Sequence, residues 1–94
     1  MKLAVYCDGA CEPVNPGGTG TYGFVIVDAA GTEMQTGYGV VGHGPTISNN
    51  VAEYVSAAMG MRAVANRVGS GDHVEVFGDN RMWVNQLNGG WRVH

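Results

Sequence analysis

The sequence predicts a single α/β domain with a mixed sheet, in which three strands, a helix, a fourth strand and a second helix follow one another (βββαβα). Three observations support this fold class. Before residue 42, apolar and polar residues alternate between glycine-rich turns, which is typical of strands. Apolar residues then recur at helical spacing over 49–68. A further strand at 73–78 follows this helix, and such a crossover favours a parallel arrangement with an earlier strand.

The first part of the chain predicts three strands. The first strand is expected at Lys2–Asp8, the second at Gly20–Ala29 and the third at Glu33–Val41. Gly9–Thr19 is a long turn punctuated by glycine and proline, and Asp28–Thr32 contains an Ala-Ala-Gly turn that predicts a hairpin. Because the connections are short, we expect an antiparallel meander.

A helix is predicted over Asn49–Val68. Its apolar stripe consists of Tyr54, Ala57, Ala58, Met61, Ala65 and Val68. Ser48 or Asn49 is a suitable N-cap, and Glu53 is expected in the first turn, where an acid suits the helix dipole. Gly60 is unfavourable there, since glycine costs about 1 kcal/mol relative to alanine inside a helix.

The last part of the chain predicts a strand and a short helix. The strand His73–Gly78 places valines on one face. Arg81–Leu87 is expected to form the short helix, with Met82, Trp83, Gln86 and Leu87 on its apolar side. The chain is therefore expected to end without a closing strand.

Length and composition limit the possible classes of protein. The 94 residues suffice for one domain spanning 1–94, and the hydrophobic fraction of 45% with 14% charged residues suits a folded chain. No apolar run approaches the roughly 18 residues that a membrane span requires, and no signal peptide is evident. We therefore expect no membrane partner.

Cys7 and Cys11 are too few for a disulfide framework, and no histidine lies at a recognisable zinc spacing, so reduced thiols in a cytoplasmic protein are expected.

The charge balance bears on nucleic-acid binding. The formal net charge is −3, and only five residues are basic. A protein that binds nucleic acid mainly by neutralising phosphates is usually basic, so composition argues against that mode. A site that meets phosphate through metal ions held by carboxylates escapes this argument.

Three acids occupy positions where a site is expected. Asp8 ends the first predicted strand, Asp79 follows the fourth, and Glu53 begins the helix between them. Sites form at the carboxyl ends of parallel strands, and converging carboxylates that repel one another favour a divalent cation such as Mg²⁺. The alternative is structural, since Asp8 suits a turn, Asp79 a helix cap and Glu53 the helix dipole.

Amide side chains form a second candidate group. Asn15, Asn49 and Asn50 lie in loops around the same strand ends, and Gln86 lies on the last predicted helix. Amides hydrogen-bond sugar hydroxyls and base edges without adding charge. For Asn15 and Asn49, turn and cap roles are the structural alternative.

One phosphate-binding pattern is rejected. Residues 18–23 satisfy G-x-G-x-x-G, but a dinucleotide site requires this loop to follow a strand and open a helix. Here the loop leads into a strand. An unrelated nucleotide-binding module would depend on this pattern alone.

Three separated motifs resemble those of ribonuclease H type 1 domains, especially the archaeal-like and bacterial short forms. The first is Asp8-Gly9-Ala10-Cys11-Glu12-Pro13, followed by Asn15-Pro16-Gly17-Gly18. The second, Ser48-Asn49-Asn50-Val51-Ala52-Glu53-Tyr54, is similar to that family's T-N-N-x-A-E-Y element. The third is Val76-Phe77-Gly78-Asp79-Asn80, followed by Asn85-Gln86-Leu87-Asn88-Gly89, and is similar to G-D-S…N-Q-L-N-G. The motifs occur in family order and span essentially the whole chain.

The resemblance implies a ribonuclease H-like mixed sheet and an endonuclease that hydrolyses the RNA strand of RNA–DNA hybrids. The catalytic, metal-holding acids of the family carry over onto Asp8, Glu53 and Asp79, with Mg²⁺ as the cofactor and Mn²⁺ as a substitute. The substrate-contacting amides near the RNA 2′-hydroxyls correspond to Asn15, Asn49 and Asn50, and Gln86 lies in the last motif.

The chain departs from the family pattern at its C-terminal end. Asn80 replaces the usual serine, and no Asp or Glu occurs from Asn80 to His94, where the family supplies a fourth acid and a fifth strand. The domain is thus expected to be truncated at its C-terminus. We expect the uncovered edge of His73–Gly78 to support a homodimer. The alternative function is a degenerate homologue that binds metal or hybrid with little or no cleavage and acts as a self-associating domain.

Overall fold

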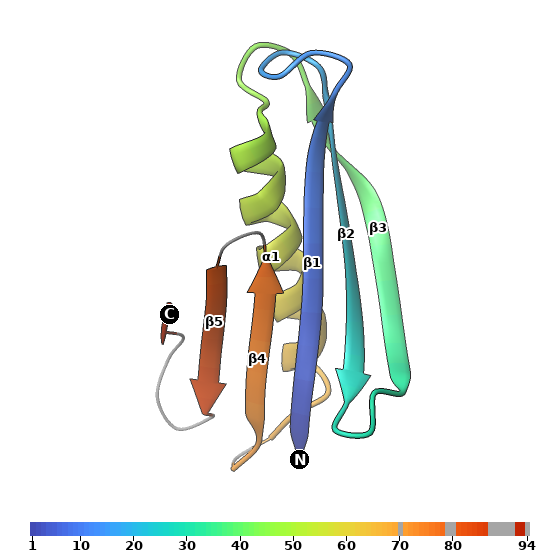
Figure 1. The fold of residues 1–94 in the computed structure, drawn as a ribbon, viewed down its shortest axis with the longest axis vertical. Helices are drawn as coiled ribbons and strands as arrows, with labels where there is room; N and C mark the ends of the chain where they lie inside the picture. Colours follow the sequence, from blue (N-terminus) through green and yellow to red (C-terminus); the bar gives the residue numbers. More distant parts are fainter. Residues whose placement is uncertain (70, 79–80, 87–91, 94) are drawn as a thin grey trace.

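The protein, represented by a computed structural model, consists of a twisted sheet with one helix on one face (Figure 1). The structure describes residues 1–69, 71–78, 81–86 and 92–93. The elements are β1 (Lys2–Glu12), β2 (Thr19–Asp28), β3 (Glu33–His43), α1 (Asn49–Ala65), β4 (His73–Gly78), β5 (Arg81–Gln86) and β6 (Arg92–Val93). Over these residues the strand order is β3-β2-β1-β4-β5-β6.

The antiparallel meander and the crossover are both confirmed. β1 pairs antiparallel with β2 from Leu3 opposite Asp28 to Glu12 opposite Thr19, and β2 pairs antiparallel with β3. β1 pairs parallel with β4, ending at Tyr6. Since β1 and β4 are central strands, residues from opposite ends of the chain lie side by side.

The predicted short helix at Arg81–Leu87 is wrong, because residues 81–86 form the strand β5. β5 pairs antiparallel with β4, from Gly78 opposite Arg81 to His73 opposite Gln86. The physical reason is that a segment this short is a marginal helix, whereas the open edge of β4 offers a full row of backbone hydrogen-bonding groups. The expected uncovered edge of β4 is therefore occupied by the chain itself, and this removes the basis for a homodimer through that edge.

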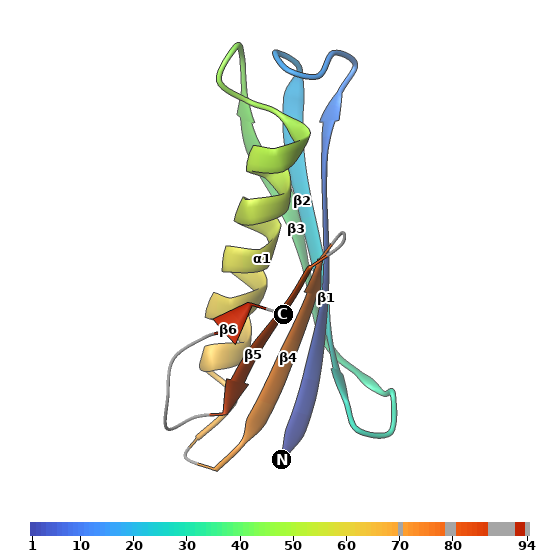
Figure 2. The same cartoon turned by 60° about the vertical axis from the view of Figure 1, so that its left-hand side comes forward.

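Helix α1 covers one face of the sheet, and the opposite face of β1 and β2 is left open by the described elements (Figure 2). The core lies between α1 and the sheet. It consists of Leu3, Val5, Ile26, Val64, Val74 and Val76. Alternation along β1 decides which residues face the helix, because successive side chains of a strand point to opposite faces. Among the described helices, none has the length and apolar character that a membrane crossing requires.

Two predictions about α1 are refined. The helix ends at Ala65, with Asn66 as its C-cap, and Glu53 lies beyond the first turn, which contains no acid. Gly60 has a packing role that offsets its low helix propensity. A Cβ at this position would lie 2.8 Å from Cγ1 of Val5 and 3.0 Å from Sγ of Cys7. The absence of a side chain therefore allows α1 to pack closely on β1.

Candidate active site

The candidate site lies where β1 continues past the end of β4. The last described pair between these strands joins Tyr6 and Phe77, whereas β1 continues to Glu12. Asp8 is therefore within β1 and does not end it, in contrast to the sequence-based expectation. Beyond Tyr6, the N-terminal end of α1 approaches the edge of β1 that β4 leaves open (Figure 1).

The amide side chain of Asn49 provides a hydrogen-bond acceptor for the backbone at this open edge of β1. Oδ1 of Asn49, the first residue of α1, accepts a hydrogen bond of 2.7 Å from the backbone N–H of Cys11. The backbone N–H of Asn49 in turn donates to Oδ1 of Asn15, at 3.0 Å. A buried backbone hydrogen-bond donor without an acceptor lowers the stability of the fold. These contacts therefore fix the position of the helix N-terminus against β1.

Capping and loop contacts explain why α1 begins at this point. Ser48 has an extended backbone, and its Oγ accepts from the N–H of Val51 at 3.2 Å, as an N-cap does. The loop before β2 and the loop before α1 are hydrogen-bonded to each other. Gly17 N–H donates to the carbonyl of Ile47 at 2.9 Å, and Gly44 N–H to that of Gly18 at 3.2 Å. The two loops are therefore held together, and together they position the N-terminus of α1.

Gly9 is the closest point of contact between β1 and α1. A Cβ at position 9 would lie 2.6 Å from the backbone nitrogen of Glu53, and closer still to the backbone carbonyl group of Ala52. Only glycine permits this approach, since no real Cβ atom lies so close to backbone. The consequence is that the backbone of Glu53 lies against the residue that follows Asp8.

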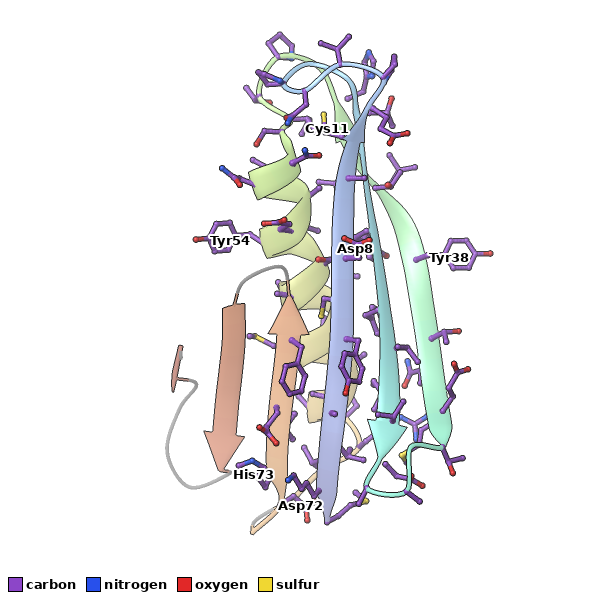
Figure 3. All side chains as sticks on the ribbon, viewed as in Figure 1. Asp8, Cys11, Tyr38, Tyr54, Asp72 and His73 are labelled. Atoms are coloured by element: carbon purple, nitrogen blue, oxygen red, sulfur yellow. The ribbon has the colours of Figure 1, made fainter. Side chains whose placement is uncertain are left out.

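The structure places the backbone of Glu53 next to Gly9, the residue that follows Asp8. Asp8 is exposed on β1 (Figure 3), and Glu53 is half-buried on α1. Successive side chains of a strand point to opposite faces, so Asp8 lies on the face opposite to Cys7. Asp79 lies outside the described residues. Within the described part of the chain, no three His, Cys, Asp or Glu residues are grouped as a metal site would require. The described part of the candidate site therefore consists of Asp8 on β1, beyond its last pair with β4, and of Glu53 on the helix that packs against Gly9.

The predicted amides divide into three groups. Asn15 and Asn49 are at the site, where their carbonyl oxygens serve the structural contacts described above. Asn50 is exposed in the first turn of α1. Gln86 pairs in the sheet with His73, and His73 pairs in turn with Lys2, so Gln86 lies at the end of the sheet remote from Asp8. The structure does not bring Gln86 to the acids.

The open face of the sheet beside Asp8 was not anticipated from the sequence. A hollow of about 370 Å³ lies there, with Asp8, Tyr6, Gly23 and Val25 among its lining residues. The ring of Tyr6 stacks on that of Phe77, with centroids 5.1 Å apart and an interplanar angle of 15°. Gly23 on β2 pairs with Asp8, so no β2 side chain fills the space beside this acid, and a glycine inside a predicted strand is the signal in the sequence.

The two thiols have structural surroundings. Cys7 points toward α1, and burial raises the pKa of its thiol to about 12, because desolvation penalises the thiolate. Sγ of Cys11 is 3.1 Å from the carbonyl oxygen of Val14, to which it donates. Both cysteines are free, and neither forms a disulfide.

Comparison with known proteins places this arrangement in a family. Residues 6–94 match the family described as "Reverse transcriptase-like". RNase H1 from the halophilic archaeon Halobacterium salinarum is 28% identical with a TM-score of 0.66, covering 81% of this chain and 52% of its own. LC11-RNase H1, isolated from compost, is 26% identical with a TM-score of 0.68, covering 80% and 51%. An N-terminal RNase H domain from Mycobacterium tuberculosis is 26% identical with a TM-score of 0.65, covering 81% and 52%.

The fold is thus the ribonuclease H-like mixed sheet that the sequence motifs indicate, and β1, α1, β4 and β5 carry described parts of those motifs. The chain belongs to the reverse transcriptase-like family and resembles its RNase H1 members. It spans about half the length of the solved relatives.

Proposed function

We propose that this chain contributes the catalytic core of an enzyme that hydrolyses the RNA strand of RNA–DNA hybrids. The observation that carries this proposal is the close approach at Gly9, which sets Glu53 of α1 against the residue after Asp8. LC11-RNase H1 has been solved in complex with an RNA/DNA hybrid. The likeness to RNase H1 structures supports the same substrate class for this chain.

The metal site proposed here uses Asp8, Glu53 and Asp79, with Mg²⁺ as the ion and Mn²⁺ as a substitute. The donor chemistry of the described pair fits, because both are carboxylates and Asp8 is open to solvent. When bound, two such ions activate the attacking water and stabilise the departing 3′ oxygen. The protein's own part is to hold the two carboxylates on rigid elements, β1 and α1, so that little reorganisation is required.

Substrate recognition is proposed to involve the amides at the N-terminus of α1. Asn50 is exposed, and Asn15 and Asn49 retain amide groups as hydrogen-bond donors while their oxygens hold the fold. Contacts with 2′-hydroxyls distinguish RNA from DNA. Reduced thiols at Cys7 and Cys11 suit the cytoplasmic location that we propose.

A second candidate function is binding of metal or hybrid with little or no cleavage. It is favoured by the lack of any Asp or Glu between Asn80 and His94, where the resemblance places a fourth acid. A site with fewer carboxylates holds a divalent cation less tightly, because each lost ligand also removes a negative charge.

The test is a cleavage assay on an RNA–DNA hybrid with Mg²⁺ and with Mn²⁺, using the chain, Asp8→Asn and Glu53→Gln. We expect cleavage by the chain and none by either variant. Glu33→Gln is the matched control, because Glu33 is an exposed glutamate on β3 and should leave cleavage unchanged.

Fluorescence anisotropy with the same hybrid separates the two candidates. Binding without cleavage in either metal, by protein that is folded by circular dichroism, supports the second function. Cleavage that survives Asp8→Asn contradicts the proposed site, whatever the substrate.

A further inference from the structure

The part of the chain that builds most of the candidate site is poor in cationic side chains. Between Lys2 and Arg62 the sequence contains no lysine and no arginine, and His43 is the only histidine in that stretch. This stretch supplies β1, β2, β3, the loops between them and the first turns of α1. Arg81 begins β5, which lies on the other side of β1 from β3. On the β3 side, His43 is therefore the one side chain of this stretch that can carry a positive charge.

The strand register places His43 on the same face of the sheet as Asp8. Glu12 lies opposite Thr19, and Thr19 lies opposite His43. Residues directly opposite in antiparallel strands share a face, and so do residues four apart in one strand, as Asp8 and Glu12 are. His43 therefore lies on the face that carries Asp8, which is the face that α1 leaves uncovered (Figure 2).

The separation between His43 and Asp8 is short on the scale of a nucleic-acid duplex. Four residues along a strand span about 13 Å and two strand spacings about 10 Å, so the two residues are roughly 16 Å apart. A duplex advances about 3.4 Å per base pair, so one that runs from Asp8 toward His43 reaches it within about five base pairs. Both residues can therefore contact the same substrate.

The imidazole ring of His43 is held at one nitrogen and open at the other. Its Nδ1 is 2.9 Å from Oγ1 of Thr19. The described residues provide no partner for its Nε2, and His43 is exposed. In the protonated ring both nitrogens are donors, so Nδ1 donates to the Thr19 hydroxyl and Nε2 is left to donate to a ligand. Because the contact with Thr19 limits rotation of the ring, His43 is a preset donor for an anion.

Few charged groups surround His43. β3 has no charged residue between Glu33 and His43, and the loops 13–18 and 44–48 have none. The first turn of α1 contains no acid. Glu12, two strands away on β1, is the carboxylate that shares this end of the face. The ion pairs of the described residues do not include His43, so its charge is available to a ligand.

We propose that protonated His43 binds a phosphate of the nucleic-acid backbone and makes hybrid binding dependent on pH. This inference rests on the proposed function, since it takes the hybrid as the ligand at Asp8. Histidine ordinarily changes its charge between about pH 5 and about pH 8, so the contact forms at the acidic end of that range and is lost at the basic end. Phosphate contacts carry no sequence information, so a DNA duplex offers the same group.

Fluorescence anisotropy with an RNA–DNA hybrid and with a DNA duplex, both in Mg²⁺, tests the proposal. Every protein carries Asp8→Asn, which we expect to prevent cleavage, so the probes stay intact. We expect affinity for both probes to rise about threefold to fivefold from about pH 8 to about pH 5.5. His43→Gln keeps a hydrogen-bonding group without a charge, and we expect it to lose most of this rise. At the lower pH, its slope of log K against log salt should be smaller by about 1.

Two further variants separate the charge of His43 from other effects of pH. His43→Arg carries a permanent charge, so we expect it to bind at about pH 8 as tightly as the unchanged histidine does at about pH 5.5. His73→Gln is the matched control, because His73 lies opposite Lys2 at the far end of the sheet and is 3.6 Å from Glu75. It should leave the pH dependence and the salt slope unchanged. Circular dichroism confirms that each variant is folded.

The proposal is overturned by an absence of binding to both probes, by a pH dependence that His43→Gln leaves unchanged, or by an equal loss in His73→Gln. Hybrid cleavage by the chain with Asp8 intact is measured separately. If the chain cleaves the hybrid while His43→Gln binds like its parent, this inference fails and the proposed function stands. If no hybrid is cleaved while His43→Gln alone loses the rise in affinity, the phosphate contact stands and the proposed function fails.

Discussion

Gly9→Ala is the sharpest perturbation of the candidate site. The new Cβ would lie 2.6 Å from the backbone nitrogen of Glu53. Ordinary contacts between heavy atoms are about 3.5–4.0 Å, so α1 must retreat from β1 by about 1 Å. The retreat moves the backbone of Glu53 away from β1 while leaving the carboxylates of Asp8 and Glu53 in the sequence.

The expected cost follows from these distances. Overpacking costs about 1–3 kcal/mol, and the upper part of this range applies because the obstructing atoms are backbone that cannot rotate away. Alanine regains about 0.5–1 kcal/mol over glycine in a strand. The net loss in the free energy of unfolding is therefore about 2 kcal/mol, which lowers Tm by roughly 10 °C in a domain of this size.

Thermal and urea unfolding followed by circular dichroism measure this loss, and titration calorimetry with Mn²⁺ measures the effect on the metal site. Gly23→Ala is the matched control, because Gly23 lies opposite Asp8 on β2 and its Cβ would be an ordinary 3.8 Å from the carbonyl oxygen of Gly37. We expect Gly23→Ala to leave stability unchanged or slightly raised. If Gly9→Ala is as stable as this control and binds Mn²⁺ equally well, the reasoning about the close approach is refuted.

Three further predictions concern the surroundings of the site. Asn49→Ala removes the acceptor of the Cys11 N–H, and we expect unfolding free energy to fall by about 1–3 kcal/mol in urea titrations. Burial holds the pKa of Cys7 near 12, so native protein at pH 8 should resist iodoacetamide at Cys7, as mass spectrometry would report. The N-terminal ammonium group, then the Gly69 N–H, lower the pKa of Asp72 below its usual value of 3.8. Its contribution is complete above the unfolded-state pKa and is lost as pH falls through the lower folded-state pKa, which an NMR titration of Asp72 would follow.

Each of these predictions has an outcome that contradicts it. Asn50→Ala is the control for Asn49→Ala, and equal losses from the two would exclude a special role for the Asn49 oxygen. Alkylation of Cys7 in folded protein at the rate seen in urea would show that its thiol is accessible. An Asp72 carboxyl that titrates at or above its usual value would show that the ammonium contact does not persist in solution.

Much of the fold was predictable because its signals are local. Alternation along 2–8 and the glycine-rich turns predict the meander, and both strand pairings of β2 are confirmed. The position of Ser48 before an apolar stripe predicts the start of α1, and its side chain does cap the helix. The helix between two strands predicts the parallel pairing of β1 with β4, since a crossover has few other solutions.

The errors arise where the partner of a segment is distant in sequence. The apolar spacing at 81–86 is compatible with a short helix. The segment forms a strand instead, because it pairs with the edge of β4. The prediction that Gln86 lies at the site is wrong for the same reason. As part of a strand, Gln86 lies opposite His73, at the end of β4 that is remote from Asp8. β1 was expected to stop at Asp8, and its pairing with β2 extends it to Glu12.

The sequence by itself determined the order of the elements from β1 to β4, the three motifs and the family that they resemble, because periodicity, capping and turn chemistry act over a few residues. Only the tertiary structure decided which backbones touch. Gly9 and Gly60 look like weak points in a strand and a helix, yet they are where α1 meets β1. Such contacts depend on atoms brought together from distant parts of the chain, so no local pattern contains them, and at Gly9 they place the backbone of Glu53 against β1.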